Sequence, residues 1–160
     1  ANTYLQKRIL ENSKQPLEDA RIHAMLTYRT PQSFDSRFGR TINEEQNRYN
    51  IESWLIYHGD KLAKRFQLEA YIMMNHLLAS INIERQGESA LEIIKNISAK
   101  IYLIAVDSDL FFTPIEDQKT FEFSKPHKKD IYYHELSSLH GHDAFLIEND
   151  DMAQILSKIF

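Results

Sequence analysis

Apolar residues recur every three or four positions through about the first 90 residues, which is the spacing of amphipathic helices. Three helices are predicted in this region: from about Leu17 to Tyr28, from an N-cap at Asn50 through Leu62, and from about Leu68 to Ile81. Pro31 disfavours a helical conformation at Thr30, so the stretch Arg29–Arg40 is predicted as a loop. The aromatic and methionine-rich faces of the later two helices indicate a core or a dimer contact rather than a cofactor site.

The pattern changes after about residue 90 from helices alone to alternating strands and helices. Ile101–Val106 is apolar on both faces, as in an interior parallel strand, and Asp130–Leu136 is a second strand. A helix is predicted to open between them at Thr113 and Pro114, with Glu116 closing a capping box. A terminal helix begins near Asp150. The second region is therefore expected to be a βαβα unit over residues 91–160, following a helical region over residues 1–90.

Two strands do not make a stable parallel sheet. A strand that is apolar on both faces needs neighbouring strands and cover on both sides, and a two-stranded sheet leaves backbone edges unpaired. We therefore expect the chain to be an α/β structure that forms the C-terminal part of a larger domain.

Composition narrows the function classes. The 160 residues carry a net charge of −4, with lysine and arginine dispersed, so no basic surface for nucleic acid is indicated. There is no cysteine, which excludes disulfides and thiolate metal sites and fits a reducing cytoplasm. No apolar run approaches the roughly 18 residues of a membrane span, and the start of the chain has no apolar signal core.

Acidic residues follow the first strand, and a histidine follows the second. Asp107 and Asp109 lie at the end of Ile101–Val106, and His142 lies 33 residues after Asp109. An acid at a strand end and a histidine in the loop after the next strand are two members of the catalytic triad of α/β-hydrolases. His142 is expected to be the general base, and the residues alone do not decide between Asp107 and Asp109 as its partner.

The third member of such a triad, a nucleophilic serine in a G-x-S-x-G turn, is not recognisable in the sequence. The turn needs two glycines four residues apart. The chain has four glycines, none so spaced: Gly39, Gly59, Gly87 and Gly141. We expect the chain to be a fragment or one half of a split protein, inactive alone.

The same residues allow one other interpretation, a metal site. His140, His142 and Asp143, together with the two strand-end aspartates, have the side chains that zinc or iron prefers. The strand-end arrangement already explains the acid and the histidine, so no metal is predicted.

Five segments resemble, in order and spacing, the homoserine O-acetyltransferase family. They are the acid segment Val106–Pro114 with Gln118, the histidine segment Gly141–Leu146, and three segments that resemble the family's lid insertion, Ala20–Thr30, Phe34–Arg40 and Ile51–Leu55. The resemblance covers nearly the whole chain from about Leu17 onward. It implies the C-terminal part of an α/β-hydrolase fold with a helical lid insertion.

The resemblance also implies an activity and a set of site residues. The family transfers acetyl from acetyl-CoA to the hydroxyl of homoserine, on the route to methionine, and its members are typically cytoplasmic homodimers that meet through lid helices. It selects Asp109 as the partner of His142. It further implies that Arg21 pairs with the homoserine carboxylate, that Tyr28 lines the acceptor pocket, and that Asp143 faces the homoserine amine. No bound cofactor is implied, since acetyl-CoA is a substrate.

Other functions remain open at this point. The donor could be succinyl-CoA or the acceptor serine, and the chain does not discriminate these. Water as the acceptor would make the protein an esterase. A non-catalytic helical module that dimerises or binds a partner is a further alternative, favoured by the apolar helix faces.

Overall fold

The computed structural model describes residues 1–160 and divides them into two compact units. The first unit contains residues 1–27 and 34–81, and the second contains residues 28–33 and 82–160. The sequence suggested a boundary near residue 90, whereas the contacts group residues 82–90 and the short segment 28–33 with the second unit. No helix in the structure combines the length and the apolar character needed to cross a membrane.

The first unit is mainly helical. Its elements are α1 (Asn2–Asn12), α2 (Pro16–Tyr28) up to residue 27, α3 (Pro31–Phe38) from residue 34, the two-residue strands β1 (Ile42–Asn43) and β2 (Arg48–Tyr49), α4 (Asn50–Ala63) and α5 (Leu68–Ser80). The predicted helices that became α2, α4 and α5 are confirmed. The antiparallel β1–β2 pair was not predicted, because two-residue strands are too short to show an alternating pattern.

The predicted loop at Arg29–Arg40 is wrong, since Pro31–Phe38 forms helix α3. Pro31 occupies the first helical position, where its missing N–H has no helical partner to lose. The Thr30 hydroxyl accepts a hydrogen bond from the Ser33 backbone N–H at 3.0 Å and so caps the helix. The proline thus ends one helix and starts the next.

The N-cap of α4 is displaced by one residue from the prediction. Tyr49 holds the N-cap position and Asn50 is the first helical residue. The Asn50 side chain donates to the Thr41 hydroxyl at 2.9 Å, and Glu52 accepts from the Tyr49 backbone N–H at 2.8 Å. Glu52 satisfies a free N–H at this helix start, which leaves the asparagine side chain for another contact.

The core of the first unit is small. Leu10, Leu17 and Ala20 are buried together, and α4 contributes the buried Leu62. By contrast, α5 has no buried residue. Only Leu68 and Tyr71 at the start of α5 pack against the core cluster, and the later apolar side chains of the helix are exposed.

The second unit begins with two short helices and continues as strands and helices in alternation. Its elements are η1 (Ile83–Gln86), α6 (Ala90–Asn96), β3 (Ile101–Val106), α7 (Pro114–Ser124), β4 (Ile131–Leu136), η2 (Gly141–Leu146) and α8 (Asn149–Leu156). Both predicted strands, the helix between them and the terminal helix are confirmed. The capping box at the start of α7 is wrong, because Thr113 makes no side-chain cap hydrogen bond and Glu116 pairs with Lys119 at 2.8 Å.

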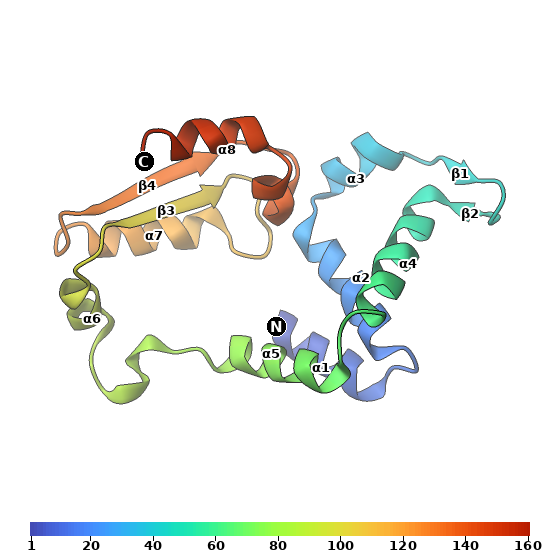
Figure 1. The fold of residues 1–160 in the computed structure, drawn as a ribbon, viewed down its shortest axis with the longest axis horizontal. Helices are drawn as coiled ribbons and strands as arrows, with labels where there is room; N and C mark the ends of the chain where they lie inside the picture. Colours follow the sequence, from blue (N-terminus) through green and yellow to red (C-terminus); the bar gives the residue numbers. More distant parts are fainter. The chain divides into compact units, whose positions relative to one another are not determined.

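Strands β3 and β4 pair in parallel, with α7 and α8 on opposite faces of the two-stranded sheet (Figure 1). The register joins Ile101 to Ile131 and Val106 to Leu136. Val106 and Leu136 bury against Ala144, and Met152 and Ile155 of α8 pack on this cluster. The carboxyl ends of the two strands consequently lie next to each other, and the loops that follow them meet at one edge of the sheet.

Gly141 opens η2 with a backbone that only glycine adopts readily. Its φ is +67°, and a Cβ atom built on it would lie 2.9 Å from the Tyr28 carbonyl oxygen. Its N–H donates to the Ser108 hydroxyl at 3.0 Å. The left-handed turn and the close approach of residues 28–33 together fix the position of the backbone that leads into His142.

Gly141→Ala is expected to lower the free energy of unfolding by about 2–5 kcal/mol, because the left-handed backbone and the steric overlap both act against it. Gly87 is a matched control: its φ is +91°, but a Cβ atom there meets nothing within 4 Å. Gly87→Ala should cost only about 1–2 kcal/mol. Urea denaturation followed by circular dichroism measures both, and equal losses would contradict the role given to the Tyr28 contact.

Candidate active site

Asp109 is held at the end of β3 by the backbone that follows it. Its Oδ1 accepts hydrogen bonds from the N–H groups of Phe111 at 2.7 Å and Phe112 at 2.9 Å. Its own N–H donates to the Val106 carbonyl at 3.1 Å, which closes the turn after the strand. Only 7% of the residue is exposed. One carboxylate oxygen is thus fixed by the local turn, and the other is left to face the histidine loop.

His142 meets that second oxygen. Its Nδ1 lies 2.8 Å from Asp109 Oδ2, and the side chain remains 26% exposed. An ionised carboxylate only accepts hydrogen bonds, so Nδ1 donates to Asp109, and in the neutral form of the ring Nε2 is the nitrogen without a proton. No group in the described structure hydrogen-bonds Nε2, which can therefore accept a proton from a substrate or a nucleophile.

The imidazole is surrounded by aromatic rings. The ring centroids of Tyr28, Phe111, Phe112 and Phe145 lie 5.2–5.9 Å from that of His142. Asp109, Phe112, His142 and Phe145 also line a cavity of about 410 Å³ that extends along β3 to Ile104. The site combines a rigidly held acid–base pair with mainly apolar walls, which strengthens electrostatic interactions inside it.

The electrostatics favour an ionised Asp109. Burial raises the pKa of its carboxyl, but hydrogen bonds from His142 and from the Phe111 and Phe112 N–H groups outweigh burial, so the pKa lies below its usual value. Asp117, on the same cavity, shows the opposite: burial and the negative charge of Asp109 raise its pKa. Asp109 is therefore the stable negative charge beside the imidazole.

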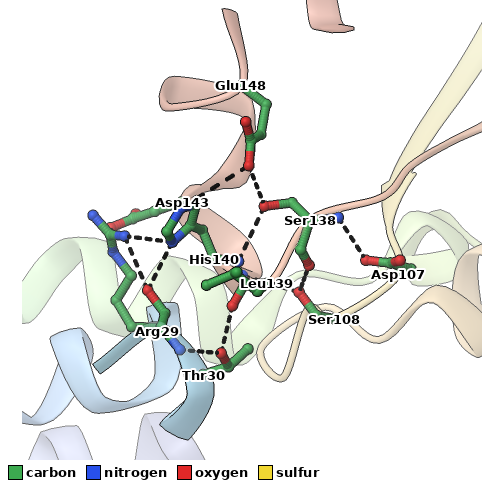
Figure 2. A network of polar contacts seen from close by, with 11 residues as sticks. Arg29, Thr30, Asp107, Ser108, Ser138, Leu139, His140, Asp143 and Glu148 are labelled. Carbon is green, nitrogen blue, oxygen red and sulfur yellow. Dashed lines mark hydrogen bonds and ion pairs between the residues drawn. The ribbon is translucent and has the colours of Figure 1, made fainter. Parts of the chain in front are cut away.

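Asp107, the other strand-end acid, binds the loop after β4 and makes no hydrogen bond to His142. It accepts hydrogen bonds from the Ser137 hydroxyl at 2.7 Å and the Ser138 N–H at 3.0 Å. Figure 2 shows it beside Ser138 in the turn after β4. Asp107 ties the two strand-end loops together, and the geometry joins Asp109 alone to the histidine.

The remaining predicted site residues divide between the two units. Tyr28 and Asp143 lie in the second unit, with Tyr28 against His142 and Asp143 directly after it. Arg21 belongs to the first unit, within the same helix α2 that ends at Tyr28. Its pairing with a substrate carboxylate stays a prediction.

Asp143 has a partner that the sequence did not indicate. Its Oδ2 accepts a hydrogen bond from Arg29 Nε at 3.0 Å, in an ion pair whose side chains are 12% and 17% exposed. Arg29 lies in the segment that was predicted as a loop. It is 114 residues from Asp143 in the sequence, so no local pattern predicts that the two pair. The backbone hydrogen bonds to Asp109 were more accessible to prediction, because an aspartate that accepts from N–H groups two and three residues later is a common turn.

The histidines and aspartates considered as alternative metal ligands do not converge on one point. His140 Nδ1 faces the Ser33 hydroxyl at 2.8 Å, Asp143 pairs with Arg29, and Asp107 binds serines. Within the structure, no group of three or more histidine, aspartate or glutamate side chains is arranged to hold a metal ion.

Curated proteins of one family resemble this chain over nearly its whole length. A homoserine O-acetyltransferase from Carboxydothermus hydrogenoformans is 38% identical over 156 residues, which is 92% of this chain and 41% of that protein. One from Methanococcus vannielii is 32% identical over 87% of this chain and 30% of its own length. The chain belongs to the homoserine O-acetyltransferase family. No protein-family profile matches it.

Solved structures identify the fold as the C-terminal part of an α/β-hydrolase fold. An esterase superimposes on 98% of this chain and 49% of its own, with a TM-score of 0.78 and 14% identity. A homoserine O-acetyltransferase from Staphylococcus aureus covers 99% of this chain and 45% of its own, with a TM-score of 0.72 and 22% identity. The chain spans about two fifths of the curated relatives and corresponds to a C-terminal portion of the family's members.

The neutral His142 side chain is expected to be the Nδ1–H tautomer, which nitrogen-15 chemical shifts of the imidazole report. Asp109→Asn should convert it to the Nε2–H tautomer, because the asparagine amide donates to Nδ1 instead of accepting from it. Asp107→Asn, which alters the neighbouring acid with no contact to the ring, should leave the tautomer unchanged. A wild-type Nε2–H tautomer would contradict the geometry.

Proposed function

We propose that this segment supplies the aspartate and histidine of a Ser–His–Asp triad that transfers an acetyl group from acetyl-CoA to the hydroxyl of homoserine, on the route to methionine. The observation that carries the proposal is the 2.8 Å contact between Asp109 Oδ2 and His142 Nδ1, with Nε2 unpartnered. Membership of the family supplies the reaction class.

The nucleophilic serine would come from polypeptide outside these 160 residues, since no pair of glycines here has the spacing of the serine turn. The longer polypeptide that carries both parts is called the parent protein below. The absence of cysteine fits a reducing compartment, and we place the reaction in the cytoplasm.

The proposed chemistry takes place in two half-reactions. His142 Nε2 removes the proton of the serine hydroxyl as the serine oxygen attacks the thioester, and it returns that proton to the departing CoA thiolate. In the second half-reaction, Nε2 removes the proton of the homoserine hydroxyl, the alkoxide attacks the acetyl-serine, and the serine leaves with the proton. Asp109 stabilises the imidazolium that forms in each half-reaction.

The acceptor would be recognised by charge. Homoserine carries an ammonium and a carboxylate beside its hydroxyl. The Asp143 carboxylate suits the ammonium, and the Arg21 guanidinium suits the carboxylate through two parallel hydrogen bonds. These two charges favour an amino acid over water as the acceptor. They do not select homoserine over serine, or acetyl over succinyl, so each donor and acceptor is to be compared in the same assay.

Asp109→Asn in the parent protein is expected to lower kcat by about 10³- to 10⁴-fold, because the asparagine still accepts from Phe111 and Phe112 but presents an amide to His142. Asp107→Asn is the matched control. Asparagine can still accept from the Ser138 N–H, so activity should stay within about threefold, as for most surface changes away from a site. CoA release measured with a thiol reagent reports both.

Equal losses in the two variants would contradict the assignment of Asp109. The isolated 160-residue chain is the negative control and should release no CoA above background. Turnover by that chain alone would refute the proposal that the serine lies elsewhere.

A homodimer that meets through lid helices is also proposed. Helices α1 and α5 expose large apolar side chains, which are Tyr4 from α1 and Ile72, Met73, Leu77 and Leu78 from α5. Several of these residues, with Leu10, line a groove of about 520 Å³ between α1 and α5. Exposed apolar area of this kind is stabilised by a partner surface.

Leu77→Lys is expected to convert the dimer to a monomer in sedimentation velocity, because a charge would be buried at the contact. Ile42→Lys is the control. Leu77 and Ile42 are each 58% exposed, and both lie in the first unit, but Ile42 is on the β1–β2 pair. A wild-type monomer, or dissociation by both variants alike, would contradict the assignment of this face.

A further inference from the structure

Residues 28–33 are bound closely to the loop that carries His142. The Thr30 hydroxyl donates to the Leu139 carbonyl, and the Tyr28 carbonyl lies against Gly141. Thr30 is only 4% exposed and Ser33 only 3%. Figure 2 shows the cluster, with Arg29 reaching across to Asp143 and His140. This segment therefore helps to set the position of the histidine loop.

Arg29 makes three polar contacts in this cluster from two nitrogens. Nε lies 3.0 Å from Asp143 Oδ2, and Nη1 lies 3.3 Å from both the Ser33 hydroxyl and His140 Nδ1. A guanidinium only donates, so His140 Nδ1 is an acceptor here. A lysine ammonium, with one nitrogen, could not hold Asp143 and His140 in the same way.

The far side of His140 is also held. Its backbone N–H donates to the Ser138 hydroxyl at 3.0 Å, and that hydroxyl donates to Glu148 Oε1 at 2.7 Å. The His140 ring itself lies between Arg29, at Nδ1, and Glu148, whose Oε1 is 4.0 Å from Nε2. A movement of Arg29 would therefore displace His140, two residues before His142, and Asp143, directly after it.

Asp143 uses only one of its carboxylate oxygens in this cluster. Oδ2 is bound by Arg29, while Oδ1 has no hydrogen-bond partner in the described structure. A carboxylate bound by a guanidinium keeps one orientation, so its second oxygen can serve a second cation. Without Arg29, the same carboxylate would be a partly buried charge with no fixed direction.

We propose that Arg29 is a positioning residue for the acceptor: it orients Asp143 so that Oδ1 binds the ammonium group of the amino-acid acceptor. The inference rests on the proposed function, in which Asp143 faces that ammonium, and assigns to Arg29 a part in choosing an amino acid over an acceptor that lacks the amine. Arg29 touches neither the substrate nor the reacting atoms.

The test compares two acceptors in the parent protein: homoserine, and γ-hydroxybutyrate, which keeps the hydroxyl and the carboxylate but has no ammonium. Arg29→Met should lower kcat/KM for homoserine by about 10- to 100-fold, mainly through KM, as expected for a lost charge-assisted contact. The value for γ-hydroxybutyrate should change less than about threefold. Arg85→Met, an exposed arginine of the same unit, is the matched control and should change neither.

Two further variants complete the test. Asp143→Asn should lose the same discrimination, and Arg29→Met added to it should cause little further loss, because both residues act on one contact. Arg29→Lys should give an intermediate loss, and it carries the test if Arg29→Met does not fold.

Equal losses with both acceptors would show that Arg29 is only structural and would overturn the proposal. A lower KM for homoserine would also overturn it, because it would mean that Arg29 opposes the ammonium. Failure of the proposed function would look different, since the wild-type protein would then not acetylate homoserine at all.

Discussion

The parallel pairing of β3 with β4 is the constraint on which the candidate site depends. It places the carboxyl ends of both strands at one edge, with Val106 opposite Leu136. Asp109 follows one strand and His142 follows the other, so their side chains meet although 33 residues separate them. An antiparallel pair would have put the two loops at opposite ends. The buried cluster of Val106, Leu136 and Ala144 stabilises this arrangement directly beneath the loops that carry Asp109 and His142.

Local backbone geometry then makes the pair specific. The turn after β3 aims two N–H groups at Asp109 Oδ1, so the carboxylate has one oxygen left for His142. The left-handed Gly141 lets the histidine loop approach Tyr28 closely. Aromatic rings enclose the imidazole on several sides. Each of these features limits the directions in which Nε2 can face, which is the property that acid–base catalysis requires.

Much of the fold and of the candidate site could be predicted from the sequence, and the predictions that were wrong have identifiable causes. The apolar run Ile101–Val106 predicted its strand because a strand covered on both faces leaves an unmistakable pattern. The loop predicted at Arg29–Arg40 was wrong, because proline is as well suited to the first position of a helix as to a break. The capping box at Thr113 was wrong, because Glu116 has Lys119 as a competing partner. Such competition between local partners is decided by small energies that a residue pattern does not contain.

The sequence by itself determined the class of fold, the family and the two residue types that meet at the strand ends, because these depend on periodicity and on short ordered motifs. The residue pattern alone left Asp107 and Asp109 equivalent, since both follow the same strand, and the family resemblance selected Asp109. The tertiary structure separates them physically, by directing Asp107 to Ser137 and Asp109 to His142. The Arg29–Asp143 pair likewise came from the structure alone. Contacts between residues more than a hundred positions apart depend on how the chain folds back on itself, and no local pattern records that.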